Sequence, residues 1–226
     1  MSRSNTKLRA RALLTGVMLI AGVATGCAQV KPIDNPENSM SSKATQTASA
    51  NSASAAIRSP DADLQAQFDY DTASRILGVS YSVRNPSTSV ALVVFDRGNA
   101  SAVAAGRQKF GAVGAPFEQA QGEDVELTHA VFPLRKPTPT VPPSPIAIRV
   151  EPGKGVTGRF EVALKGSVAP KRLRWCVGVA PFDTGYLHEP HDSAQGQLWT
   201  ASFTVVDHQR MLCTPWYDVA TGKFES

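Results

Sequence analysis

Residues 64–83 have the sequence LQAQFDYDTASRILGVSYSV, in which the architecture of the chain is most clearly encoded. Apolar side chains occupy alternate positions on both sides of a polar interruption, Asp71-Thr72-Ala73-Ser74. Because successive side chains of a β-strand point to opposite faces, this period of two predicts two strands joined by a turn, each with one buried face. A third strand is predicted at 90–95, after a turn at Asn85-Pro86-Ser87-Thr88, which would complete a three-stranded meander.

The rest of the chain continues this pattern with short interruptions. Further strands are predicted at 125–131, 146–150, 156–164, 173–179, 198–206 and 210–219. The Ala- and Gly-rich segment 98–122 is expected to be a long connection that holds at most one short helix, near 100–107. About nine strands with almost no helix predict an all-β protein, a β-sandwich or a related open barrel.

One predicted hairpin carries a fold-level resemblance. The pattern Val-Glu-Pro-Gly-x-x-Val-x-x-x-Phe-x-Val at 150–162 is similar to a hairpin of many immunoglobulin-like domains. The resemblance implies an immunoglobulin-like β-sandwich over residues 61–226 and no particular activity.

The chain begins with the organisation of an export signal. Four cations come first: Arg3, Lys7, Arg9 and Arg11. An apolar run at 12–23, too short to span a bilayer comfortably, leads to the small residues of Ala24-Thr25-Gly26-Cys27. This ending resembles the lipobox of bacterial lipoproteins, with Cys27 at the position of the lipidated acceptor, although Ala24 departs from the usual leucine.

The lipobox resemblance implies a signal peptide at 1–26 and attachment of diacylglycerol and palmitate chains to Cys27. Several acyl chains anchor a protein stably, whereas one chain anchors it only marginally. Ala28, which stands where an aspartate would alter sorting, favours the outer membrane by the same resemblance, with the domain facing the periplasm. An ordinary cleaved signal with a chance cysteine nearby is the alternative.

The formal charge of +4 comes entirely from the leader. The chain has 23 Lys and Arg and 19 Asp and Glu; four of the cations and none of the acids precede Cys27, which leaves 19 of each sign. A neutral mature chain gives no electrostatic reason to expect nucleic acid as a partner. The expected partners are the membrane, through the lipid anchor at Cys27, and another envelope protein.

Cys176 and Cys213 are the other two of the three cysteines. If Cys27 is lipidated, an even pair stays in an oxidising compartment, and a disulfide between them is predicted. Closing a loop of this length stabilises a fold by about 3–4 kcal/mol. Two free thiols or half of a metal site are the alternatives, and the lack of a C-x-x-C motif disfavours redox or zinc chemistry.

Two segments are predicted to lie outside the sheets. Residues 27–60 are predicted to be a flexible tether, because the Ser-, Ala- and Thr-rich stretch 39–54 cannot bury enough apolar surface to offset the entropy of ordering it. A coil of this length spans roughly 30 Å. The proline-rich stretch 136–145 is predicted to adopt polyproline II, either as a stiff crossover between sheets or as a strip presented to a partner.

The sequence holds no recognisable catalytic constellation and no cofactor motif. The strongest candidate is His188-Glu189-Pro190-His191-Asp192, near Asp183, because imidazoles and carboxylates can ligate a transition metal. Pro190 excludes a regular helical pairing and no further His or Cys stands at a suitable spacing, so a solvated polar loop without a metal is predicted. Gly153-Lys154-Gly155 lacks the spacing of a phosphate-binding loop and is predicted to be a hairpin turn.

The three tryptophans are the remaining candidates for a binding surface. They fall in predicted strands, where Trp175 and Trp199 are expected to pack in the core beside the disulfide, and a ligand surface that includes Trp216 is the alternative. The expected function is a membrane-anchored, periplasm-facing binding or structural module of the cell envelope, without catalysis. A small-ligand- or metal-binding module is the first alternative, and a cell-wall hydrolase with an unrecognised site is the second.

Overall fold

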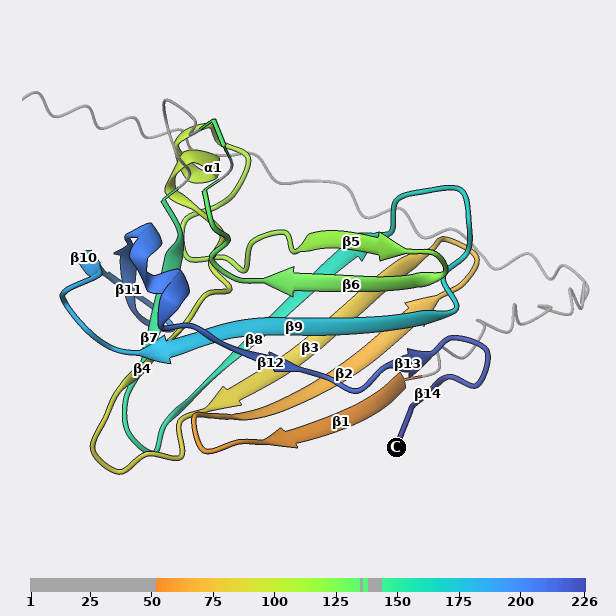
Figure 1. The fold of residues 1–226 in the computed structure, drawn as a ribbon, viewed down its shortest axis with the longest axis horizontal. Helices are drawn as coiled ribbons and strands as arrows, with labels where there is room; N and C mark the ends of the chain where they lie inside the picture. Colours follow the sequence, from red (N-terminus) through yellow and green to blue (C-terminus); the bar gives the residue numbers. More distant parts are fainter. Residues whose placement is uncertain (1–51, 135, 138–143) are drawn as a thin grey trace, which may run out of the picture. The chain divides into compact units, whose positions relative to one another are not determined.

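The computed structural model describes residues 52–134, 136–137 and 144–226. The predicted signal peptide, Cys27, most of the predicted tether and residues 138–143 of the proline-rich stretch therefore lie outside the described residues. The described part is nearly all β, and its two sheets pack face to face (Figure 1). The prediction of an all-β sandwich is confirmed, whereas its immunoglobulin-like type is not.

The smaller sheet has the strand order β1-β2-β3-β8 and is antiparallel throughout. Its strands are β1 (Ser52–Arg58), β2 (Asp63–Asp71), β3 (Ile76–Arg84) and β8 (Gly155–Ala163). The alternation predicted at 64–83 is confirmed, because Leu64, Phe68 and Leu77 point into the sandwich and are fully buried. The two hairpin strands β2 and β3 pair over nine residues each without a register shift.

Two predictions about this part of the chain are wrong. Residues 52–58 were expected in the tether that ends at 60, but they form β1 and pair with β2 along their whole length. Backbone pairing supplies the hydrogen bonds of this strand, so its small Ser and Ala side chains do not prevent it. Residues 90–95 do not complete a meander with β2 and β3, because β8 occupies the free edge of β3 and β4 (Leu92–Val94) lies in the other sheet.

The larger sheet is built around one long strand, β9 (Arg172–Pro181). Along its main path the strand order is β10-β11-β7-β4-β9-β13-β14, with β12 and β6 also paired to β9 and β5 paired to β6. The remaining strands are β5 (Phe117–Gln121), β6 (Asp124–His129), β7 (Ile146–Val150), β10 (Leu187–Ser193), β11 (Gly196–Ala201), β12 (Arg210–Cys213), β13 (Tyr217–Asp218) and β14 (Lys223–Phe224).

Several predicted boundaries change in this sheet. The predicted strand 198–206 ends at Ala201, after which the chain forms a 3-10 helix, η1 (Phe203–Asp207). The predicted strand 210–219 divides into β12 and β13. The expected connection 98–122 contains β5 as well as the predicted short helix, α1 (Ala100–Ala104). Asn99 begins that helix, since its side-chain Oδ1 accepts a hydrogen bond from the backbone N–H of Ala102 at 2.8 Å.

The parallel pair β6–β9 is held in register by charge. Asp124 lies opposite Arg172 and Glu126 lies opposite Arg174, and each opposed pair forms an ion pair. Both guanidinium groups lie over the ring of Trp216, at 5.1 and 4.3 Å from its centroid. Trp216 therefore supports this ladder on the outer face of the sheet, and opposite charges directly across the strands favour one register over its neighbours.

The predicted disulfide between Cys176 and Cys213 is present and joins β9 to β12. Beside it in sequence, Trp175 is fully buried against the rings of Tyr81 and Phe160, with centroids 4.5 and 5.6 Å away. Trp199 packs on a second, smaller cluster and contacts Phe182. No helix in the described part of the chain combines the length and the apolar character that crossing a membrane requires.

A candidate binding cavity at a fork in the larger sheet

The strand β9 exchanges one neighbour for another along the same edge. Its residues 172–177 pair with β6 in the parallel direction, and its residues 179–181 pair with β4 in the antiparallel direction. The two neighbours meet end to end, because His129 lies opposite Val177 while the N–H of Phe95 donates to the carbonyl of Gly178 at 3.0 Å. Neither strand can continue, so the segments that follow β6 and β4 both leave the sheet at this place, which we call the fork (Figure 1).

Side-chain amides replace the strand partners that are missing at the fork. Gln108 Nε2 donates to the carbonyl of Arg97 at 2.7 Å. The amide of Gln209 bonds both backbone groups of Val131, accepting from its N–H at 2.8 Å and donating to its carbonyl at 3.1 Å. Because buried backbone groups without partners destabilise a fold, these amides allow the two segments of the chain to diverge inside the protein.

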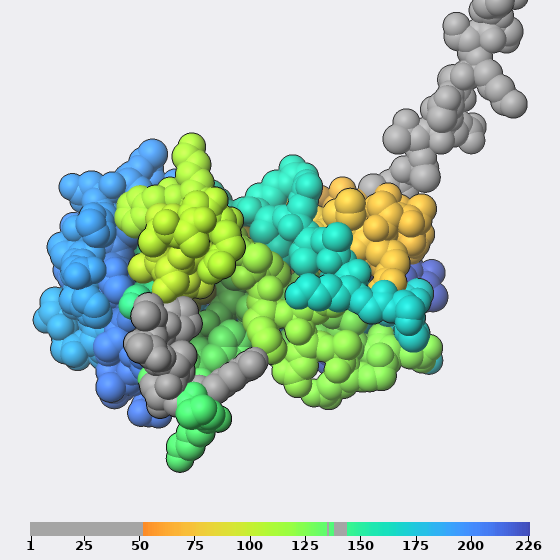
Figure 2. Space-filling view, turned by 90° about the horizontal axis from the view of Figure 1, so that it is seen from above, coloured from red at the N-terminus to blue at the C-terminus, as the bar shows by residue number. Residues whose placement is uncertain are grey.

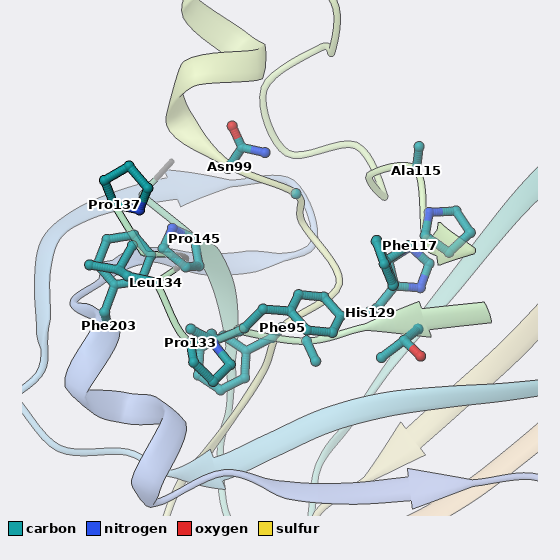
Figure 3. Close-up of a pocket in the computed structure, with 16 residues that line it drawn as sticks. Phe95, Asn99, Ala115, Phe117, His129, Pro133, Leu134, Pro137, Pro145 and Phe203 are labelled. Carbon is teal, nitrogen blue, oxygen red and sulfur yellow. The ribbon is translucent and has the colours of Figure 1, made fainter. Parts of the chain in front are cut away.

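An apolar cavity of about 820 Å³ lies at the fork (Figure 3). Figure 2 shows the surface hollowed beside the segment that carries α1. The described wall carries four phenylalanines and four prolines: Phe95, Phe117, Phe132, Phe203, Pro116, Pro133, Pro137 and Pro145. This volume falls within the range of about 300–1,000 Å³ that small-molecule sites occupy.

Two of these phenylalanines form the rim of the cavity. Phe117 begins β5, Phe132 follows β6, and their ring centroids are 5.0 Å apart. They are 43% and 44% exposed, whereas Phe95 in the inner wall is 3% exposed. The apolar surface therefore continues from solvent into the interior.

The polar side chains of the described wall already have partners inside the protein. Asn99 caps α1, and Thr128 Oγ1 donates to Glu126 Oε1 at 3.2 Å. Trp175 Nε1 donates to Nδ1 of His129 at 3.0 Å, so the ring proton of His129 is on Nε2, which donates to the carbonyl of Gly114 at 2.9 Å. Burial holds the pKa of His129 below its ordinary value of 6.5, which keeps the ring neutral.

A buried ion pair stands behind the inner wall. Asp96 and Arg97 are fully buried, with Arg97 Nη1 3.3 Å from Asp96 Oδ2. The hydroxyl of Tyr81, from the smaller sheet, donates to the same carboxylate oxygen, and Arg97 Nη2 donates to Gln195 Oε1 at 2.9 Å. Burial raises the pKa of Asp96, while the guanidinium of Arg97 opposes that rise. This cluster links the two sheets at the fork and offers no ionised group to solvent.

The segment predicted to be a polar loop near 188–192 is instead the edge strand β10. Its register against β11 shifts between His188 and His191, and Glu189 has a φ of 53°. His191 contacts the ring of Phe110 edge-on at 5.4 Å. Asp183 turns the preceding loop by accepting from the N–H of Gly185 at 2.7 Å. Among the described residues, no group of three or more His, Cys, Asp and Glu is placed to hold a metal ion.

The sequence did not reveal the cavity, because its wall comes from five separate segments, near 95–99, 115–117, 128–137, 145 and 203. No motif joins them, and the parallel pairing that brings β6 beside β9 has no local signature. The one available signal was Phe117, since Phe110 and Phe117 are the only aromatic residues in the predicted connection 98–122.

Comparison with known proteins adds no relative. No protein-family model, no curated protein and no solved structure matches this chain.

Proposed function

We propose that this protein is a lipid-anchored binding module of the bacterial cell envelope that faces the periplasm, most simply from the outer membrane. The anchor is Cys27, at the end of a leader that resembles a lipobox. The single observation that carries the binding role is the apolar cavity at the fork, with its exposed rim of Phe117 and Phe132. Concave apolar surfaces of this size are typical of binding sites.

The disulfide supports an exported protein. Cys176 and Cys213 are joined between β9 and β12, and structural disulfides persist mainly in oxidising compartments such as the periplasm. With the leader removed, equal numbers of acidic and basic residues are left, which fits a partner held by apolar contacts rather than by charge.

The chemistry of the cavity supports binding without catalysis. A general base needs a free ring nitrogen or carboxylate within reach of a substrate. Both nitrogens of His129 are engaged, and Asp96 is enclosed with Arg97 behind the wall. Neither group is available to a molecule in the cavity.

The anchor is tested by metabolic labelling with palmitate in the native host. Cys27→Ser should abolish incorporation and release the protein from the membrane fraction, because it removes the acceptor thiol. Ala28→Asp is the matched control: it should keep the label and, by the lipobox resemblance, move the protein to the inner membrane. Label retained in Cys27→Ser would refute the anchor.

Docking of another envelope protein is the second candidate, and the exposed pair Phe117 and Phe132 favours it, since aromatic residues are enriched in protein interfaces. A photo-crosslinking residue at position 132 should then capture one defined partner in intact cells, and the same residue at position 110 should not. A random background from both positions would remove this candidate.

A further inference from the structure

We infer that the cavity at the fork is a site for a saturated hydrocarbon chain, supplied by a membrane lipid or by a free fatty acid. The inference rests on the proposed binding role and narrows it to one class of ligand. None of the described residues that line the cavity carries a formal charge, because the ring of His129 is neutral. A charged group placed there would lose its hydration without gaining a counterion.

The wall is also unsuited to a buried peptide. A peptide segment brings an N–H and a C=O with each residue, and these groups need hydrogen-bond partners when they are buried. Pro116, Pro133 and Pro145 have no backbone N–H to offer, and the ring of His129 has both nitrogens engaged. A hydrocarbon chain needs no such partners.

The shape of the cavity fits a linear chain. Figure 3 shows Phe117 at one end, Phe95 between, and Phe203 at the other end. Exposure falls from 43% at Phe117 to 3% at Phe95, so a chain that enters at the rim becomes buried as it passes the fork.

Another hollow in the described surface has a different lining. It lies over the smaller sheet and is lined largely by hydroxyl and amide side chains, among them Ser54, Gln65 and Thr157. These side chains carry donors and acceptors that a hydrocarbon chain would leave without partners. The phenylalanine- and proline-rich wall at the fork therefore suits a hydrocarbon better than this hollow does.

The test is a calorimetric titration of the full mature chain carrying Cys27→Ser, so that acyl chains of its own cannot occupy the site. Octanoate, decanoate, laurate and myristate are titrated below their micelle concentrations. Each added methylene should tighten binding about fourfold until the cavity is filled, after which the affinity should level off. Absence of binding, or an affinity independent of chain length, would overturn the inference.

Two matched variants locate the site. Phe132→Asp places a charge on the rim and should weaken laurate binding at least tenfold. Phe110→Asp changes a phenylalanine of almost equal exposure, 42% against 44%, that does not line the cavity, and it should bind as the parent does. Equal affinity in the two variants would refute the assignment to the fork. Because both side chains are exposed, the free energy of unfolding should change little in either variant.

The source of the chain is identified by mass spectrometry of the organic extract of protein purified from native membranes. A diacyl lipid or a fatty acid that is enriched with the parent protein and lost with Phe132→Asp supports the inference and names the source. If neither a diacyl lipid nor a fatty acid is enriched with the parent protein, the inference is contradicted. The titration and the palmitate labelling are independent, so loss of the hydrocarbon site leaves the anchor at Cys27 standing, and the converse also holds.

Discussion

The smaller sheet is a continuous antiparallel ladder, whereas the larger sheet is interrupted where β6 and β4 meet along β9. In the smaller sheet, alternate side chains fill the inner face completely, as Leu64, Phe68 and Leu77 do. At the fork, the segments that follow β6 and β4 leave the sheet, and side-chain amides replace their backbone pairing. A cavity lies between the diverging segments. From this difference we expect the ladder to supply stability, and we propose that the interruption supplies a binding site.

The largest effect on stability is expected in the ladder. Phe68→Ala should lower the free energy of unfolding by about 3–5 kcal/mol, because the ring is fully buried and contacts Tyr217 and Phe224. Urea denaturation followed by circular dichroism measures the loss. Phe132→Ala on the rim is the comparison, and it should stay within about 0.5 kcal/mol of the parent. Equal losses at the two positions would remove the distinction between ladder and fork.

The second-largest loss of stability is expected on removal of the disulfide, which holds β9 one residue before the fork. Replacing Cys176 and Cys213 together by alanine should lower stability by about 3–4 kcal/mol, since the bond closes a loop with a sequence separation of 37. The same denaturation experiment measures it, and addition of reductant should change the parent protein and leave the double variant unaffected. A loss below about 1 kcal/mol would show that the loop is already constrained in the unfolded chain.

A buried ion pair distinguishes the fork from the ladder. Asp96→Asn should destabilise the protein by about 3 kcal/mol, because Arg97 is left as a buried charge without a counterion. This loss is at the lower end of the range of about 3–5 kcal/mol for breaking a buried ion pair. The reason is that an amide oxygen at position 96 can still accept from the hydroxyl of Tyr81. Asp96→Leu combined with Arg97→Met should lose less than Asp96→Asn alone. A larger loss of stability in the double variant than in Asp96→Asn would show that the two side chains also depend on other groups around them.

The smallest of these effects is a pH dependence carried by His129. Its pKa in the folded protein lies below the ordinary 6.5, so the unfolded chain takes up a proton near pH 6.5 that the folded protein does not. The stabilisation by the neutral ring is complete above pH 6.5 and is lost as the pH falls toward the folded-state pKa, at about 1 kcal/mol per pH unit. His129→Gln should remove this contribution to the change of unfolding free energy with pH. Urea denaturation at several pH values between 7 and 5 measures that change.

Thr128→Ser is the control for this measurement, because it changes the neighbouring side chain without altering any titrating group. It should keep the slope of the parent. A slope in His129→Gln as steep as that of the parent would assign the acid sensitivity to other groups.

The ladder was predictable because its information is local. Alternation from Leu64 to Val83 specifies two strands and their buried face, and the turn at Asp71-Thr72-Ala73-Ser74 joins them. The same local reasoning missed β1, whose Ser and Ala side chains carry no apolar signal, and placed 90–95 beside the wrong strand. The first error concerns a strand without apolar alternation, and the second concerns which strands become neighbours. A period of two contains neither piece of information.

The candidate site was not predictable for the same reason. Its wall depends on the parallel pairing of β6 with β9, which brings Phe117 and Phe132 beside residues that follow β4. The disulfide was predictable from the number of cysteines together with the predicted export of the chain. The polar segment at His188 attracted attention through residue type, yet its two imidazoles lie on an edge strand with a register shift between them.

The most direct test of the contrast between ladder and fork is nuclear magnetic resonance with a spin-labelled fatty acid bound to the Cys27→Ser protein. Paramagnetic broadening should be concentrated on the backbone amides of Val131 and Phe132 and their neighbours around the fork, and unlabelled laurate should reverse it. Amides of β2 and β3 should keep their intensity. Broadening spread over the surface, or concentrated on the smaller sheet, would contradict the assignment of the binding site to the interruption in the larger sheet.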